Sequence, residues 1–144
     1  MAADSASYVS YLETSMILAA ILDEDAGAFA SLNVTTPRIT SALTVAEASR
    51  AIRRARAAER IGARQERTAH VALEVFFGTC SVVDINGEIL LRAGRRFPIE
   101  PVRTLDAIHL ATVESVGIPP HLVRVITRDR RVRENALAMG YSVS

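Results

Sequence analysis

Four acidic residues occupy positions from which carboxylates could act together in catalysis or metal binding: Glu13, Glu47, Asp106 and Asp129. Glu13 and Asp129 follow predicted strands, whereas Glu47 and Asp106 fall in the first turns of predicted helices. In a right-handed parallel sheet, all these ends face one edge. Carboxylates gathered there would repel one another, and Mg²⁺ or Mn²⁺ would relieve that repulsion at an all-oxygen site. A bound cation of this kind activates water and stabilises the charge that develops on a phosphodiester.

Each of these acids also has a purely structural interpretation. Asp106 is the clearest case, because it lies in the stretch Arg103–Thr112, in which Thr104 is a good helix N-cap. Leu105 would then be the first helical residue, and Asp106 would meet the positive end of the helix dipole. That interaction is worth roughly 0.3–1 kcal/mol at an exposed site. Helix capping or solvation explains any one acid more simply, whereas the shared placement of all four favours a site.

The chain alternates between short runs of β-formers and longer apolar or amphipathic runs. The predicted strands are residues 8–12, 38–43, 79–85, 122–126 and 141–143. The predicted helices are residues 16–22, 26–32, 44–59, 63–77, 88–95, 105–117 and 130–139. Thr14 or Ser15 is expected to cap the first helix, and Gly140 to end the last one in the left-handed conformation. This alternation indicates an α/β fold with a parallel sheet and helices on both faces.

Length and composition favour one domain. The 144 residues suffice for a single core, so we expect a flexible tail at residues 1–7 and one domain at residues 8–144. All 17 basic residues are arginine, and the net charge of +1 predicts no class of partner. Cys80 is expected to be a buried structural thiol, and a single cysteine suits a reducing, cytoplasmic location. No apolar run reaches the ~18 residues of a membrane span, and residues 1–7 lack a signal-peptide pattern.

Several motifs, taken in their order along the chain, resemble those of a known family. The most specific is Arg103–Ala111, which reads RTLDAIHLA; the next is Val125–Arg131, with Gly140–Val143 closing the domain. Tyr11–Ser15 and Ser41–Glu47 match the segments that carry the first two acids. On these residues the chain resembles the PIN-domain ribonucleases, and within them the VapC-type toxins of toxin–antitoxin pairs, over almost its whole length.

The resemblance implies a single three-layer α/β/α domain with a mostly parallel sheet flanked by helices, and a Mg²⁺- or Mn²⁺-dependent endoribonuclease site. Transferred position by position, Glu13, Asp106 and Asp129 would be metal ligands. Glu47 would orient or deprotonate the attacking water. The supporting residues would be Thr14, Ser15 and Thr127.

The first acidic position departs from the family pattern. Family members normally carry Asp where this chain has Glu13. Glu keeps the charge, but its extra methylene moves the carboxylate by about an ångström. A misplacement of that size can cost on the order of 100-fold in rate. The departure therefore leaves the fold unaffected and concerns catalytic strength.

Arginines are concentrated in two places. Seven of the 17 fall within residues 50–67, including Arg50 and Arg54, and a second group beside Asp129 includes Arg128 and Arg130. One interpretation is a solvated helical face paired with nearby glutamates such as Glu59 and Glu66. The other is contact with RNA phosphates or with an acidic antitoxin segment, and Arg54, two helical turns after Glu47, could point at the same site. Because aromatic residues make up only 5% of the chain, RNA recognition would depend on shape and backbone.

His109, three residues after Asp106, could approach the acidic site, although a structural helix histidine is the favoured interpretation.

Two functions stay open. The first is a metal-dependent endoribonuclease toxin that cleaves structured cellular RNA and is neutralised by a cognate, VapB-like antitoxin. The second is a PIN domain weakened by Glu13 that acts mainly as an antitoxin-binding protein. A metal phosphatase or DNA nuclease is a third and weaker interpretation. The resemblance also implies a homodimer, and nothing in the sequence indicates a membrane partner.

Overall fold

Among the described residues, the sheet consists of five short strands that all run parallel. The computed structural model describes residues 8–34 and 36–144, so the predicted tail at residues 1–7 lies outside the described residues. The strands are β1 (Val9–Leu12), β2 (Arg38–Ser41), β3 (Ser81–Val83), β4 (Val123–Ile126) and β5 (Ser142–Val143). Their order is β3-β2-β1-β4-β5, and each neighbouring pair is parallel. The predicted parallel sheet is confirmed.

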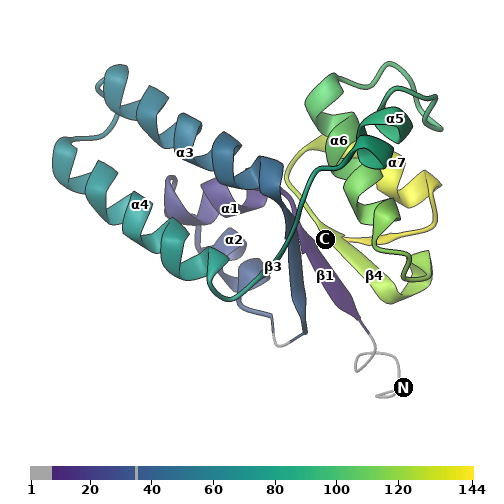
Figure 1. The fold of residues 1–144 in the computed structure, drawn as a ribbon. Coiled ribbons are helices and arrows are strands. Elements are labelled where there is room, and N and C mark those ends of the chain that lie inside the picture. The colour runs from purple at the N-terminus through teal and green to yellow at the C-terminus, as the bar shows by residue number, and fades with distance from the viewer. Residues whose placement is uncertain (1–7, 35) are drawn as a thin grey trace.

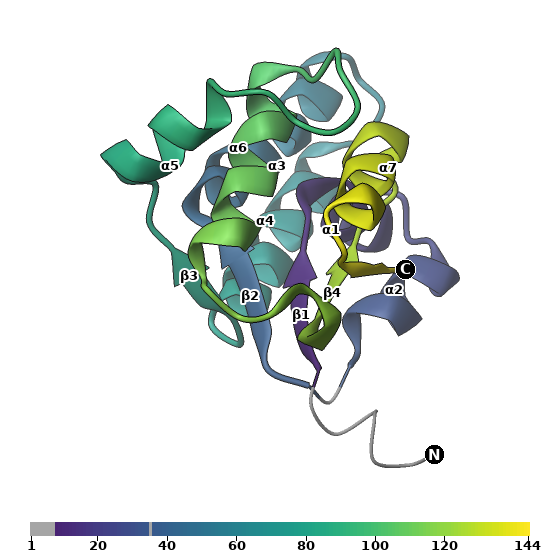
Figure 2. The same ribbon diagram turned by 90° about the vertical axis from the view of Figure 1, so that its right-hand side faces the viewer.

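In the part of the chain that the structure describes, seven helices cover the two faces of this sheet (Figures 1 and 2). They are α1 (Thr14–Ile21), α2 (Ala26–Leu32), α3 (Ala42–Ala57), α4 (Ala63–Phe77), α5 (Gly87–Ala93), α6 (Thr104–Ser115) and α7 (Arg130–Ala138). Helices α1 to α4 pack on one face, and α5 to α7 pack on the other. A 3₁₀ turn, Pro120–Leu122, precedes β4. The predicted three-layer α/β/α architecture is confirmed.

Alternation along β1 divides the core between these two layers. Leu12 packs with Ile126 and with α1 to α4, whereas Tyr11 packs with Val125 and with α6 and α7. The register pairs Tyr11 with Val125 and Leu12 with Ile126 across β1 and β4. Successive side chains of a strand point to opposite faces, so one strand supplies both cores. Consequently, Tyr11 points towards the helix that carries Asp106.

Three helix starts differ from the predictions. Glu13, not Thr14 or Ser15, caps α1, because its side chain accepts a hydrogen bond from the Ser15 amide. Ser41 caps α3 in the same way, so the helix begins at Ala42 and Glu47 lies in its second turn rather than its first. Arg103 occupies the N-cap position of α6 without a side-chain cap, which makes Asp106 the third helical residue. Acceptors that are adjacent in sequence compete for the same free amides, and local patterns cannot rank them.

Two smaller expectations are also modified. The third strand is shorter than residues 79–85, because the amides of Thr79 and Cys80 bond back to the end of α4. Cys80 is half-buried at the edge of the core, where burial raises the pKa of its thiol.

Gly140 has φ +96° after α7, as predicted. Within residues 8–34 and 36–144, no helix is long and apolar enough to cross a membrane.

The core beneath α3 gives a test of this packing. Ile52 is fully buried between α3 and its neighbours. We expect Ile52→Ala to lower the free energy of unfolding by about 2–5 kcal/mol, because it removes buried methylene groups and leaves a cavity. Val71 on α4 is 60% exposed, and Val71→Ala should change that free energy by less than about 0.5 kcal/mol. Chemical denaturation measures both, and equal losses would contradict the described packing.

Candidate active site

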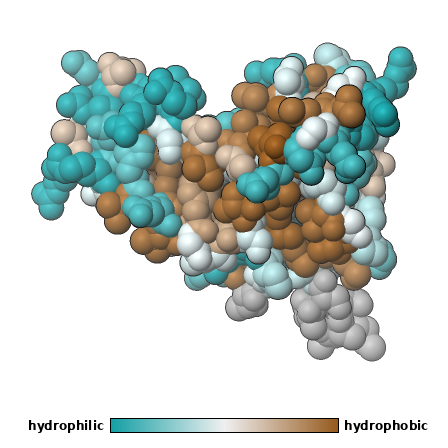
Figure 3. Space-filling view, in the orientation of Figure 1, coloured by the Kyte–Doolittle hydropathy of each residue, from teal (hydrophilic) through white to brown (hydrophobic). Residues whose placement is uncertain are grey.

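The acidic residues meet at the carboxyl edge of the sheet, where the strand order reverses. Strands β1 and β4 are neighbours in the middle of the sheet. The chain continues from β1 to β2 on one side of this pair and from β4 to β5 on the other side. In open α/β sheets, such a switch point forms a crevice in which ligands bind. Glu13 directly follows β1, and Thr127 and Asp129 follow β4. The space-filling view shows the surface indented between the two groups of helices above this edge (Figure 3).

Glu13 is held by a ring of hydrogen bonds at the start of α1. Its side chain is almost fully buried. One carboxylate oxygen, Oε1, accepts from the Ser15 hydroxyl and, at 2.5 Å, from the Thr127 hydroxyl. The other, Oε2, accepts from the Ser15 amide at 3.1 Å. The predicted supporting residues Ser15 and Thr127 therefore contact the first acid directly.

Asp106 on α6 carries the least satisfied carboxylate of this site. Its Oδ2 atom is buried without a hydrogen-bond partner, and the nearest cation, Arg103 Nε, is 3.9 Å away. Burial is the main cause that raises the pKa of Asp106, and the negative charges of Asp129 and Glu13 raise it further. The charges of Arg103 and His109 act in the opposite direction. The ionised form of Asp106 is therefore disfavoured here.

Asp129 joins the site through the loop after β4. Its amide donates to the Thr127 hydroxyl at 2.9 Å, and its Oδ1 caps α7 by accepting from the Val132 amide at 3.0 Å. Because its charge raises the pKa of Asp106, the two carboxylates lie close enough to interact. Asp129 therefore caps α7 and also belongs to the acidic group.

Glu47 lies on the other side of the site, on α3. Its Oε1 accepts from the Thr14 hydroxyl and from His109 Nε2, both at 2.7 Å. Burial by itself raises the pKa of Glu47, but the hydrogen bonds from His109 and Thr14 and the charges of His109 and Arg54 outweigh it and lower that pKa. Glu47 is therefore ionised at neutral pH. Thr14, the third predicted supporting residue, contacts Glu47 rather than Glu13.

The sequence interpretation underrated His109 and missed Tyr11. His109 is 1% exposed, so it is a buried helix residue as expected, yet it also contacts Glu47 and lies 4.0 Å from Glu13 Oε2. Tyr11 bonds to the other ring nitrogen, Nδ1, at 2.7 Å. The three-residue spacing from Asp106 was the available signal for His109. Nothing local marks Tyr11, whose partner is 98 positions away.

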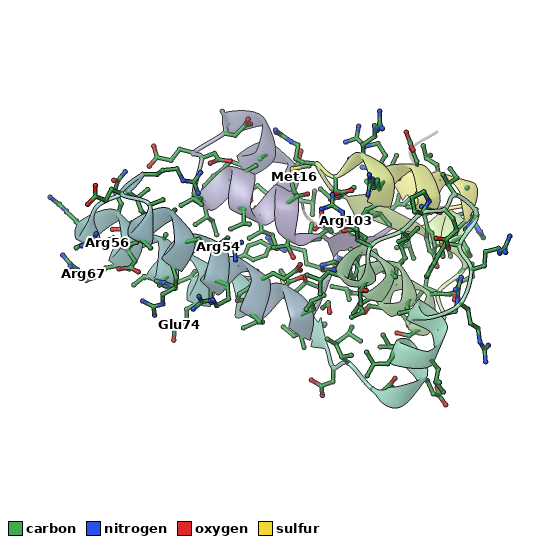
Figure 4. All side chains as sticks on the ribbon, turned by 90° about the horizontal axis from the view of Figure 1, so that it is seen from above. Met16, Arg54, Arg56, Arg67, Glu74 and Arg103 are labelled. Carbon is green, nitrogen blue, oxygen red and sulfur yellow. The ribbon has the colours of Figure 1, made fainter. Side chains whose placement is uncertain are left out.

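The arginines divide between structural and site positions. Arg53 and Arg56 pair with Glu66, which confirms the solvated-face interpretation for these two. Arg54 is near enough to lower the pKa of Glu47. Arg54 on α3 and Arg103 before α6 flank the acidic edge, which Figure 4 views from above.

The remaining predicted contact residues differ in their surroundings. Arg128 pairs with Asp25, the N-cap of α2, at 3.0 Å, and its amide donates to the Ser15 hydroxyl. Arg130 approaches Glu134 at 3.6 Å and remains exposed, and Arg50 is exposed on α3. Asp25 is thus both the N-cap of α2 and the ion-pair partner of Arg128.

The sheet order, the position of the acids and the motifs around them agree with a family model described as the PIN domain, which matches residues 10–137. The chain is a PIN-domain protein of the VapC type. It is 35% identical to Ribonuclease VapC46 of Mycobacterium tuberculosis over 92% of this chain and 94% of that relative. It is 36% identical to Ribonuclease VapC35 of the same organism over 92% of this chain and 93% of that relative.

Solved structures share the fold of this PIN domain. Mycobacterium tuberculosis VapC20, described as a sarcin–ricin loop cleaving toxin, has a TM-score of 0.65 at 19% identity, over 92% of this chain and 95% of that one. VapBC2 from Rickettsia felis, solved with a promoter DNA fragment, has a TM-score of 0.65 at 10% identity, over 94% and 97% of the two chains. At these identities the likeness concerns the fold alone.

The donor chemistry of the PIN-domain site suits a divalent cation. Its candidate ligands are carboxylate oxygens, and Asp106 Oδ2 is a buried acceptor without a donor. Among the described residues, however, no three acidic, histidine or cysteine side chains converge closely enough to form a complete ligand set. Ser15 and Thr127 hold Glu13 instead. The residues therefore fit a cation in type, and Glu13 would join Asp106 while Ser15 and Thr127 bond to its Oε1 atom.

Asp106→Asn tests the electrostatic part of this description. Because the folded state raises the pKa of Asp106 above the usual 3.8, ionising this group costs stability as pH rises through the folded pKa. We expect Asp106→Asn to raise the melting temperature at pH 7 in metal-free buffer, with the gain vanishing below about pH 3.8. Thermal melts across pH measure it, beside Asp23→Asn on the surface. A less stable Asp106→Asn protein at pH 7 would contradict the prediction.

Proposed function

We propose that this chain is a Mg²⁺- or Mn²⁺-dependent endoribonuclease toxin that a cognate antitoxin neutralises. The observation that carries the proposal is the buried Oδ2 atom of Asp106, which has no hydrogen-bond partner and shares the switch-point crevice with Glu13 and Asp129. A fold alone does not imply a reaction, so the chemistry of the site and the activities of the chain's relatives have to point to the same reaction. They do agree: relatives at 35% and 36% identity are named ribonucleases.

Each acid has a role in this proposal. Glu13, Asp106 and Asp129 would hold the cation, which when bound supplies a Lewis acid for the phosphodiester and lowers the pKa of water. Glu47, ionised and fixed by Thr14 and His109, would orient the attacking water and accept its proton. Thr127 and Ser15 would position Glu13 and the loop of Asp129.

The substrate would be RNA held mainly through its backbone. Arg54 and Arg103 flank the acidic edge, and Arg50 and Arg130 are exposed. Guanidinium groups bind phosphates in two-pronged geometry. Arg128 would contribute only by leaving Asp25. Because few aromatic residues are available for base stacking, recognition would depend on folded RNA shape.

An antitoxin and a second copy of the chain are the proposed protein partners. Solved relatives include VapBC complexes from Salmonella typhimurium and Haemophilus influenzae. An apolar groove between α1, α2 and α4, lined by residues that include Ile21, Phe29 and Val75, could receive an antitoxin segment. The exposed apolar residues Leu90 and Leu91 on α5 suit a homodimer contact. Figure 3 shows apolar surface across the middle of the molecule in the orientation of Figure 1.

RNA cleavage by the purified chain without partner tests the proposal. We expect discrete products from cellular RNA with Mg²⁺ or Mn²⁺ and none with EDTA. Asp106→Asn should lower the rate by at least about 100-fold, because the carboxylate that anchors the cation is lost. Asp23→Asn is the matched surface control. Equal cleavage by wild type and Asp106→Asn would indicate a contaminating nuclease, and no cleavage of several RNA pools by folded protein would refute the enzyme.

A second candidate function, antitoxin binding with weakened catalysis, is favoured by the state of Glu13. Its longer side chain reaches Ser15 and Thr127 and accepts three hydrogen bonds from them. Such an occupied carboxylate has less capacity for a cation. In this interpretation, the chain would retain its docking surfaces and lose its reaction.

Glu13→Asp separates the two candidates. If the chain is a working nuclease, shortening Glu13 moves the carboxylate away from its partners, and we expect the cleavage rate to fall by up to about 100-fold. The rate constant with saturating Mn²⁺ is the measurement. Glu74→Asp makes the same change on the exposed side of α4 as a control. A strong rise in cleavage from near zero would instead establish the weakened PIN domain.

A further inference from the structure

We infer that His109 is a positioning residue that fixes the Glu47 carboxylate, and that Tyr11 in turn fixes His109. The inference rests on the proposed function, in which Glu47 acts on the attacking water. It assigns a task to two buried side chains outside the acidic group. The juxtaposition brings together β1, α3 and α6, which are distant in sequence.

The contacts form a continuous buried chain. The Tyr11 hydroxyl lies 2.7 Å from His109 Nδ1, and His109 Nε2 lies 2.7 Å from Glu47 Oε1. Both Tyr11 and His109 are 1% exposed, so water does not compete for these groups. The two rings meet edge to face, with centroids 6.1 Å apart. The imidazole therefore has one defined orientation.

The direction of the hydrogen bond to Glu47 follows from the charge of its carboxylate. Glu47 is ionised and can only accept, so Nε2 must carry a hydrogen and donate it. At the other end of the chain of contacts, the Tyr11 hydroxyl lies 2.7 Å from Nδ1, within hydrogen-bond distance. The imidazole of His109 is therefore held at both ring nitrogens.

This arrangement restricts where Glu47 can point. Thr14 from α1 and His109 from α6 bond to the same oxygen, Oε1, and Thr44 lies 3.2 Å from the Thr14 hydroxyl. The other oxygen of Glu47 then has a fixed direction for a water molecule. Glu13 Oε2, 4.0 Å from Nε2, is the second carboxylate that faces the imidazole. Groups oriented in this way lower the reorganisation needed for reaction.

A merely structural histidine would also be buried and hydrogen-bonded, so the test requires coupling to Glu47. We expect His109→Leu to lower kcat for RNA cleavage by about 10–100-fold with little change in KM. His109→Gln, which can keep an amide donor towards Glu47, should recover most of the loss. In a Glu47→Gln background, His109→Leu should have almost no further effect. The surface control is His121→Gln.

An additive effect of His109→Leu in the Glu47→Gln background would overturn the positioning role, and so would His109→Gln proteins as impaired as His109→Leu. Tyr11→Phe removes only a hydroxyl, so it tests the same chain of contacts even if the histidine variants misfold. We expect it to fold and to lower kcat by about 2–10-fold. An unchanged kcat in Tyr11→Phe would overturn the part assigned to Tyr11.

Imidazole ¹⁵N NMR of the metal-free full chain gives a readout that does not need catalysis. We expect His109 to carry a hydrogen on Nε2, and we expect Tyr11→Phe to shift the Nδ1 resonance. An Nε2 without a hydrogen, or an Nδ1 resonance unmoved by Tyr11→Phe, would overturn the inference. If wild-type protein never cleaves RNA, the proposed nuclease fails, whereas the NMR result still decides whether the chain of contacts exists.

Discussion

Repulsion between carboxylates at the β1–β4 switch point is the constraint on which the rest of the structure depends. Asp106 is half-buried with one oxygen unpartnered, and Asp129 and Glu13 make its ionisation harder still. A fold optimised for stability alone would separate these groups. Here the hydrophobic cores on both faces of the sheet hold the ends of β1, β4 and α6 together against that repulsion.

Hydroxyl groups distribute this charge. Ser15 and Thr127 stabilise the Glu13 carboxylate, Thr127 also receives the Asp129 amide, and Thr14 stabilises Glu47. Hydrogen bonds to a charged acceptor are stronger than those between neutral groups, so a few hydroxyls offset much of the cost of burial. The extra methylene of Glu13 gives the reach for these contacts. Glu at position 13, where family members normally carry Asp, thus stabilises the metal-free site. It also determines how freely this carboxylate can bind a cation.

The two helical layers divide the work of the molecule. Helices α1 to α4 present Glu47, Arg54 and an apolar groove. On the other face, α6 carries Asp106, and Asp129 caps the N-terminus of α7. The Arg128–Asp25 pair joins the layers, because it links the loop after β4 to the start of α2. Contacts at the proposed antitoxin groove and the proposed contacts with substrate would therefore meet at one loop.

The sequence by itself determined the order of the elements, the parallel sheet and the position of Glu13, Asp106 and Asp129 at element ends, because each depends on periodicity and capping along a few residues. Helix starts at Glu13, Ser41 and Arg103 were missed by one or two residues, since neighbouring caps differ little in energy. Only the tertiary structure decided what each acid contacts. Glu13 meets Thr127 across 114 positions and His109 meets Glu47 across 62. Such partners are set by strand register and helix packing, which no local pattern contains.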